Sequence, residues 1–149
     1  MSLGVESAVD GAFERRPLKV EGHWSWHVPV HLSQGWLLDD LVIVGGQISV
    51  DGQGKVIGPG DIEVQTREVF SNIAKVLAEA GVGWEHVVKL NTYYVCDSAA
   101  DIVEFWEKMT RVRMEFLREP GPAATAVRVV GLMYPELVIE AEAMAVRPR

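Results

Sequence analysis

The sequence contains very little cysteine, since Cys96 is the single one among 149 residues. One thiol excludes an internal disulfide, a cysteine zinc cluster and a CxxC redox pair. Long apolar runs are also missing, because none approaches the roughly 18 to 20 residues that a membrane span needs. The N-terminus carries Glu6, Asp10 and Glu14 and lacks the basic-then-apolar layout of a signal peptide. These absences predict a cytoplasmic protein with no membrane partner.

Clustered positive charge is scarce as well. The chain has 14 Lys and Arg against 21 Asp and Glu, a formal net charge of -7. Proteins that bind nucleic acid neutralise phosphates with grouped basic side chains. Here the densest basic group, Arg111, Arg113 and Arg118, alternates with acidic and apolar residues. We therefore expect no nucleic-acid partner.

Three of the four histidines, His23, His27 and His31, recur every fourth residue. That spacing aligns metal ligands on a helix. Pro29 forbids a continuous helix through them. Scattered surface histidines are the favoured interpretation, and we predict neither a metal site nor a cofactor.

The first 28 residues show no sustained periodicity and are punctuated by Pro17 and Gly22. We predict an irregular N-terminal arm at 1–28 and a single domain at 29–149. Trp24 and Trp26 are unusual for a disordered tail, so the end of the arm is expected to pack on the domain.

Within the domain, the periodicity of apolar residues predicts an α+β fold in the order β-β-α-β-α-β-β. The expected elements are strands at 31–36 and 41–50, a helix from 61 to 80, a strand at 87–95, a helix that ends at 120, and strands at 125–132 and 137–146. Asp61 is the expected N-cap of the first helix, and Gly81 its C-terminal stop. Two helices cover only one face of such a sheet. The other face is rich in apolar residues, so we expect an oligomer to bury it.

Three motifs carry further information, and they occur in a defined order. Residues 42–48 read V-I-V-G-G-Q-I, residues 87–95 read V-V-K-L-N-T-Y-Y-V, and a C-terminal pair reads G-P-A-A-T-A-V at 121–127 and V-I-E-A-E-A at 138–143. Together they resemble the YjgF/RidA (reactive intermediate deaminase) family over roughly 30–147. That family has an SGQ second strand, a V-K-x-x-V-F-V third strand, and a P-A-R-S segment before a strand reading I-E-I-E-A.

The resemblance implies a chorismate-mutase-like fold, in which the sheets of a homotrimer close into a central barrel. It also implies small-molecule clefts between neighbouring subunits. Many members of the family hydrolyse reactive enamines or imines, such as 2-aminoacrylate, and release ammonia. A strand arginine grips the substrate carboxylate, and a glutamate on the last strand positions or activates water. That glutamate corresponds to Glu140.

The chain departs from the family at the arginine. Counting forward from Pro122, the arginine position is Ala124, and counting back from Glu140 it is Thr125. Neither residue supplies a guanidinium, which binds a carboxylate through two charge-assisted hydrogen bonds. Arg128 is a candidate substitute, although it lies about 13 Å from Ala124 along an extended strand. We expect little activity on 2-imino acids.

The remaining site positions each have two interpretations. Glu140 is either a general base or a structural strand carboxylate. Gly45 and Gly46 either present backbone amides to a ligand or make room for packing. Of the alternating Tyr93 and Tyr94, one is expected to line the cleft. The candidate site consists of Glu140 as the catalytic residue, with Leu32 (at the family's aromatic position), Gly45, Gly46, Tyr93, Ala124, Thr125 and Arg128 as substrate-binding positions.

Three functions compete. The first is a Rid-type protein that binds, and hydrolyses, a small reactive enamine or imine metabolite between subunits. The second is a non-catalytic trimer that binds a ligand or stabilises proteins, which the alanine at position 124 favours. The third is an endoribonuclease, a name that the family has carried. The acidic charge and the lack of a recognisable His-His or His-Lys motif argue against it.

Overall fold

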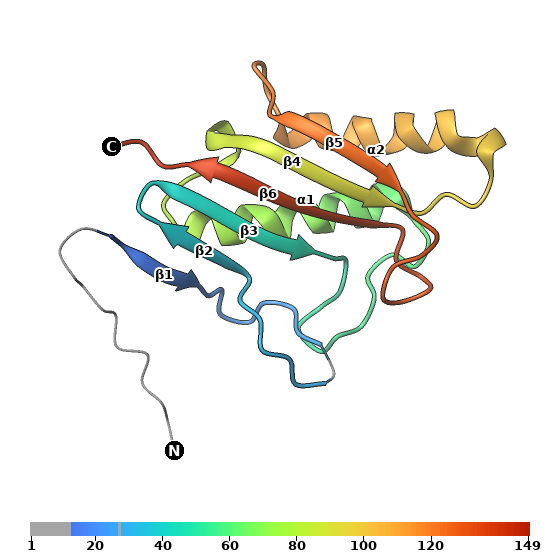
Figure 1. Ribbon diagram of the computed structural model, residues 1–149. Coiled ribbons are helices and arrows are strands. Elements are labelled where there is room, and N and C mark those ends of the chain that lie inside the picture. Colours follow the sequence, from blue (N-terminus) through green and yellow to red (C-terminus); the bar gives the residue numbers. More distant parts are fainter. Residues whose placement is uncertain (1–12, 27) are drawn as a thin grey trace.

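A computed structural model describes residues 13–26 and 28–149, and within them one mixed sheet is covered by two helices. The strands are β1 (Arg15–Leu18), β2 (Gly35–Leu38), β3 (Leu41–Gln47), β4 (Val87–Tyr94), β5 (Ala123–Arg128) and β6 (Ile139–Val146). The helices are α1 (Ile62–Glu79) and α2 (Ile102–Phe116). The sheet order is β1-β2-β3-β6-β4-β5, with β4 and β5 parallel and every other neighbouring pair antiparallel. Both helices lie on the same face of the sheet (Figure 1). The predicted α+β architecture is confirmed.

The local signals at the ends of the first helix act as predicted. The Asp61 carboxylate accepts hydrogen bonds from the backbone N–H groups of Glu63 and Val64, both at 3.0 Å. At the other end, Gly81 adopts a φ of 72°, which glycine tolerates and other residues rarely adopt. The second helix ends at Phe116, four residues before Pro120.

The interpretation of 1–28 as an irregular arm is wrong for its central part. Arg15–Leu18 forms the edge strand β1, which pairs antiparallel with β2 so that Leu18 lies opposite Gly35. Pro17 is compatible with an edge strand because it removes a donor that a central strand would need. The fully buried Leu18 side chain joins the main core and holds this strand in place. Residues 1–12 and His27 lie outside the described residues, so the arrangement of the three spaced histidines remains a prediction.

Strand boundaries shift by a few residues. The first expected strand, 31–36, is observed at 35–38, and the expected 125–132 is observed at 123–128. The final ladder contact of β5 is the N–H of Val129 donating to the carbonyl of Tyr94, after which the chain turns away. Val130, just beyond that point, is fully exposed. The prediction, which followed the run of β-branched residues, therefore extended this strand too far toward the C-terminus.

The face of the sheet toward the helices forms the core. Alternate residues of β6 (Ile139, Ala141, Ala143 and Ala145) are buried beneath α1. The helix approaches the sheet closely at Gly35, where an added Cβ would lie 2.6 Å from the Ile43 carbonyl oxygen and 2.8 Å from a Val76 methyl group. Small residues on the strands therefore allow close packing of α1, which in turn sets the positions of the strands at the site.

The opposite face, here called the open face, carries none of the helices in the described part of the chain. One end of it is apolar, with Trp36, Leu38, Leu41, Ile43, Met144 and Val146. Its other end is polar, with Lys89, Asn91, Tyr93, Thr125, Glu140 and Glu142. No helix among the described residues is long and apolar enough to cross a bilayer. The candidate site lies at the polar end.

Candidate functional site

Glu140 and Gly46 meet at an irregularity in the sheet. Strand β3 takes three steps from Val44 to Gln47 while β6 takes two, from Ala143 to Ala141, so β3 has one extra residue, a β-bulge. A Cβ built on Gly46 would collide with Oε1 of Glu140. The glycine therefore leaves the space that the Glu140 carboxylate occupies. Bulges are frequent beside active sites, because they redirect side chains.

The Glu140 carboxylate is half-buried, and no basic side chain within residues 13–26 and 28–149 pairs with it. Among the described residues, nothing hydrogen-bonds to its side chain or forms an ion pair with it. Burial raises the pKa of the Glu140 carboxyl, and the nearby Glu142 carboxylate raises it further. A carboxylate that burial and a like charge destabilise is poised to accept a proton.

The neighbouring strand places polar groups in the same region. The Asn91 amide and the Tyr93 hydroxyl each donate a hydrogen bond to Oε1 of Glu142, both at 3.1 Å. The hydrogen bond from the Tyr93 hydroxyl to Glu142 is the main reason why the pKa of Tyr93 is raised. Tyr93 pairs directly with Glu140 across β4 and β6, so both side chains emerge on the open face. Lys89 donates to the hydroxyl of Thr125 at 3.2 Å.

The two alternatives for the missing arginine lie on opposite faces of β5. Thr125 pairs with Asn91 and shares the open face with Glu140. Ala124 and Arg128 alternate with it and face the helix side, because their partners on β4 are the core residues Leu90 and Tyr94. The guanidinium of Arg128 thus leaves the strand on the face away from Glu140 of the same chain.

Tyr94 lies in the core, where its ring contacts Phe105 and Trp106 with centroids 5.6 and 5.4 Å apart. Of the two tyrosines, Tyr93 is therefore the one on the open face. The backbone amide of Gly45 is not available to a ligand, because its N–H already donates to the Gln34 carbonyl at 2.8 Å. Of the two glycines, Gly46 makes room for the Glu140 side chain, and their role toward a ligand stays a prediction.

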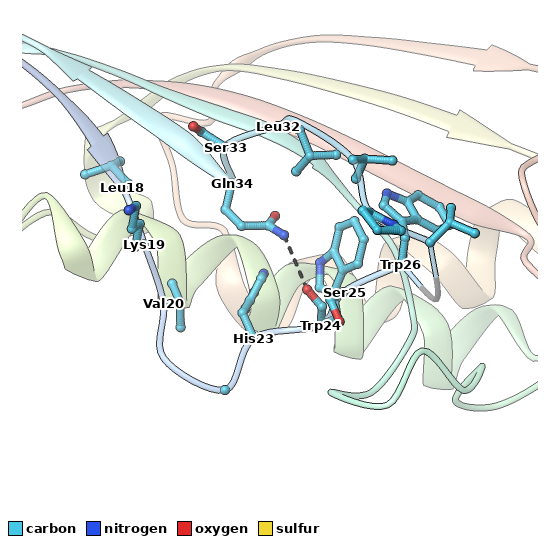
Figure 2. A pocket seen from close by; sticks show the side chains of 14 residues that line it. Leu18, Lys19, Val20, His23, Trp24, Ser25, Trp26, Leu32, Ser33 and Gln34 are labelled. Carbon is cyan, nitrogen blue, oxygen red and sulfur yellow. Dashed lines mark hydrogen bonds between the residues drawn. The ribbon is translucent and has the colours of Figure 1, made fainter. Parts of the chain in front are cut away.

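Leu32 lies in a cavity that the sequence did not reveal. The cavity, here called the arm pocket, has a volume of about 510 Å³ and is lined by residues between 18 and 34 (Figure 2). Its apolar lining includes Leu18, Val20, Trp24 and Trp26, besides Leu32. The sequence signal for it was the pair of tryptophans in a segment otherwise interpreted as an arm.

The arm is anchored by Gln47, which is completely buried at the end of β3. Its side-chain oxygen accepts from the indole N–H of Trp24 at 2.8 Å and lies 2.7 Å from Nε2 of His23. An indole N–H can only donate, so the Gln47 atom that it contacts is the amide oxygen. Because that oxygen only accepts, His23 must donate to it through Nε2. The Gln47 amide nitrogen donates to the Gln34 side chain at 2.8 Å. Burial lowers the pKa of His23, which agrees with a neutral ring.

These features describe a small α+β domain with a half-buried carboxylate beside a glycine bulge on its open face. The family described as Endoribonuclease L-PSP matches residues 27–147. A RutC family protein of Pyrococcus abyssi is 37% identical over 113 residues, which cover 76% of this chain and 84% of that protein. The chain therefore belongs to the Endoribonuclease L-PSP family, also called YjgF/RidA.

Solved structures show the same fold. RidA from the Antarctic bacterium Psychrobacter superposes with a TM-score of 0.73 at 23% identity, covering 88% of this chain and 98% of that one. TdcF of E. coli, a structure with bound serine, superposes with a TM-score of 0.71 at 24% identity and covers 89% and 99% of the two chains. At this identity the likeness establishes the fold, and the residues of the site must carry any inference about chemistry.

Proposed function

We propose that this protein is a Rid-type homotrimer that binds and hydrolyses a small, reactive imine or enamine in a cleft between subunits. The observation that carries the proposal is Glu140, a half-buried carboxylate with no partner among the described residues, placed over Gly46 at the bulge. A carboxylate held in this way costs stability, and such a cost is typical of functional sites.

In this mechanism Glu140 shuttles protons between water and the imine nitrogen. The carboxylate takes a proton from water as the water oxygen bonds to the imine carbon, and it gives that proton to the nitrogen. It then takes the proton of the new hydroxyl group and delivers it to nitrogen as the C–N bond breaks. The products are a carbonyl compound and ammonia, and Glu140 returns to the carboxylate form. General base catalysis of this kind contributes about 10²- to 10⁴-fold.

The substrate differs from the 2-imino acids that the family resemblance implies. A carboxylate next to the reactive carbon is best held by a guanidinium, and neither Ala124 nor Thr125 supplies one. The cation on this side is the ammonium of Lys89, which donates to the Thr125 hydroxyl and cannot form the paired hydrogen bonds of an arginine. Arg128 faces away from Glu140 of its own chain, as its pairing with Tyr94 shows. The two carboxylates at the polar end, Glu140 and Glu142, would repel a further negative charge. An imine without an adjacent carboxylate fits this site better.

The proposal is tested by ammonia release from a panel of imines generated in the assay. We expect turnover of imines that lack a carboxylate and little or none of 2-aminoacrylate. Two variants, Ala124→Arg and Thr125→Arg, restore a guanidinium on opposite faces of β5. Gain of 2-aminoacrylate activity in one of them would identify the family's arginine position. Equal rates of the unmodified protein on both substrate types would contradict the substrate assignment.

A second candidate is a trimer that binds a ligand without hydrolysing it, and the alanine at position 124 is the observation that favours it. This function predicts saturable binding of small imines or amides with no ammonia release from any of them. An endoribonuclease is disfavoured, because the open face presents Glu140 and Glu142 and the net charge is -7.

A further inference from the structure

The arm pocket is not explained by the chemistry at Glu140. Its volume of about 510 Å³ lies within the roughly 300 to 1,000 Å³ of ordinary small-molecule sites. Part of its wall, residues 18–26, precedes the segment that matches the family, which begins at residue 27. The pocket therefore depends on a portion of the chain that the family description does not cover.

The tryptophan side of the pocket is held in one arrangement. Trp24 is buried and hydrogen-bonded to Gln47, and its ring meets that of Trp26 edge-on with centroids 5.2 Å apart. Trp26 in turn lies 5.6 Å from the ring of Tyr134, in the connection between β5 and β6. Figure 2 shows the two indoles on one side of the cavity. A wall fixed in advance binds a ligand with little loss of conformational entropy.

A short chain of contacts links the wall of the pocket to Glu140 through the bulge of β3. Gln34, one of its lining residues, accepts the N–H of Gly45 through its backbone carbonyl at 2.8 Å. The next residue, Gly46, lies against the Glu140 carboxylate. Leu32 stands where the family resemblance places an aromatic side chain, and its smaller size leaves room in the pocket. Gln34 on the wall of the pocket and the Glu140 carboxylate are thus connected through the two glycines of the bulge.

The lining favours an uncharged, apolar group. Aliphatic and indole side chains dominate it, and His23 is a neutral ring because burial lowers its pKa. Lys19 is the remaining basic residue of the lining, and it is exposed to solvent. Charges in such a position are screened by water and contribute little to binding.

We propose that the arm pocket binds the apolar group of the substrate, an aromatic ring or a branched aliphatic chain, while the C=N carbon lies at Glu140. This inference rests on the proposed function for the orientation of the substrate, whereas binding of an apolar ring is testable by itself. It narrows the substrate class to uncharged imines with a bulky apolar substituent.

Titration calorimetry of the full-length protein tests the pocket with three probes. Phenylacetamide has an uncharged amide and a ring, phenylacetate exchanges the amide for a carboxylate, and acetamide lacks the ring. We expect saturable binding of phenylacetamide at up to millimolar concentration, and at least tenfold weaker binding of the other two. Absence of saturable binding, or equal binding of acetamide, would overturn the inference. Tighter binding of phenylacetate would assign the site to anions held by Lys19 and would overturn it as well.

Matched variants locate the binding. Val30→Trp places a large side chain in the lining of the pocket, while Val130→Trp makes the same change at a fully exposed position in the β5–β6 connection. Phenylacetamide should bind at least tenfold more weakly to the first variant and unchanged to the second. Glu140→Gln should keep this binding even though it removes the proposed base. If no imine is turned over but the binding pattern holds, the proposed reaction fails and the pocket assignment stands. Unchanged binding in Val30→Trp would overturn the pocket assignment.

Discussion

A single glycine makes room for Glu140, the proposed base. The carboxylate is half-buried, its pKa is raised by burial and by Glu142, and the space that it occupies exists because residue 46 has no side chain. From sequence alone, Glu140 and the two glycines were separate candidates at distant positions. Their contact depends on the register shift between β3 and β6. Glycines inside a strand indicate such a bulge, but they do not identify the residue on the other strand that meets it.

Gly46→Ala tests this contact. The new methyl group would collide with the end of the flexible Glu140 side chain, which can move at little cost. We therefore expect the melting temperature to change by only a few degrees while turnover falls at least tenfold. Gly131→Ala is the control, because an added Cβ there meets nothing within 4 Å. Full activity of Gly46→Ala would show that the position of Glu140 does not matter.

The pH dependence of turnover reports the state of Glu140. A general base works only when it is deprotonated, and the pKa of this carboxyl is raised in the folded protein. Activity should therefore be lost on acidification at a higher pH than an ordinary glutamate with a pKa of about 4.3 would give. A kcat profile from pH 4 to 8 measures this acid limb. A limb at or below the ordinary value would contradict the assignment.

At the scale of elements, the sequence predicts what local rules determine and misses what distant contacts determine. The N-cap at Asp61, the stop at Gly81 and both helices follow from periodicity and capping. Strand β1 was missed because four residues containing a proline carry no strand pattern. Its existence depends on pairing with β2 and on the burial of Leu18. The arm pocket was also missed, because it too depends on contacts between residues that are distant in the sequence.

Gln47 links the arm to the sheet, and its removal should release the arm. In Gln47→Leu, the donors on Trp24 and His23 lose their acceptor in a buried place, at about 1–3 kcal/mol for each unsatisfied group. We expect the free energy of unfolding to fall by at least about 2 kcal/mol in chemical denaturation. Gln53→Leu, in an exposed turn, should leave it nearly unchanged. Equal stability of the two variants would show that the network contributes nothing.

At the scale of the whole molecule, the open face is the part of the sheet that the two helices leave uncovered. Its apolar end exposes Leu41, Met144 and Val146, with 37%, 42% and 47% of each residue accessible. Exposed apolar surface of this kind is typical of a protein–protein interface. The proposed homotrimer buries it and brings a second subunit to the polar end, where Glu140 lies.

Met144→Glu tests the trimer. A charge in the middle of the proposed interface should dissociate it, so light scattering should change from about three times the 16.5 kDa chain mass to one chain. Met114→Glu makes the same substitution on the outer surface of α2, where 62% of the residue is exposed, and should leave the trimer intact. An unmodified protein that is monomeric at micromolar concentration would contradict both the trimer and the cleft between subunits.

The most direct measurement of the central claim compares turnover and thermal stability in one preparation of Glu140→Gln. The amide keeps the shape of the side chain and removes the base, so ammonia release should fall about 10²- to 10⁴-fold. A carboxyl whose pKa is raised by folding stabilises the protein below its unfolded pKa and loses that contribution as the pH rises through the folded value. At pH 7 the charge is therefore a cost, and its removal should leave the melting temperature unchanged or raise it. Lost turnover with a lower melting temperature would make Glu140 structural, and normal turnover would contradict its role as the base.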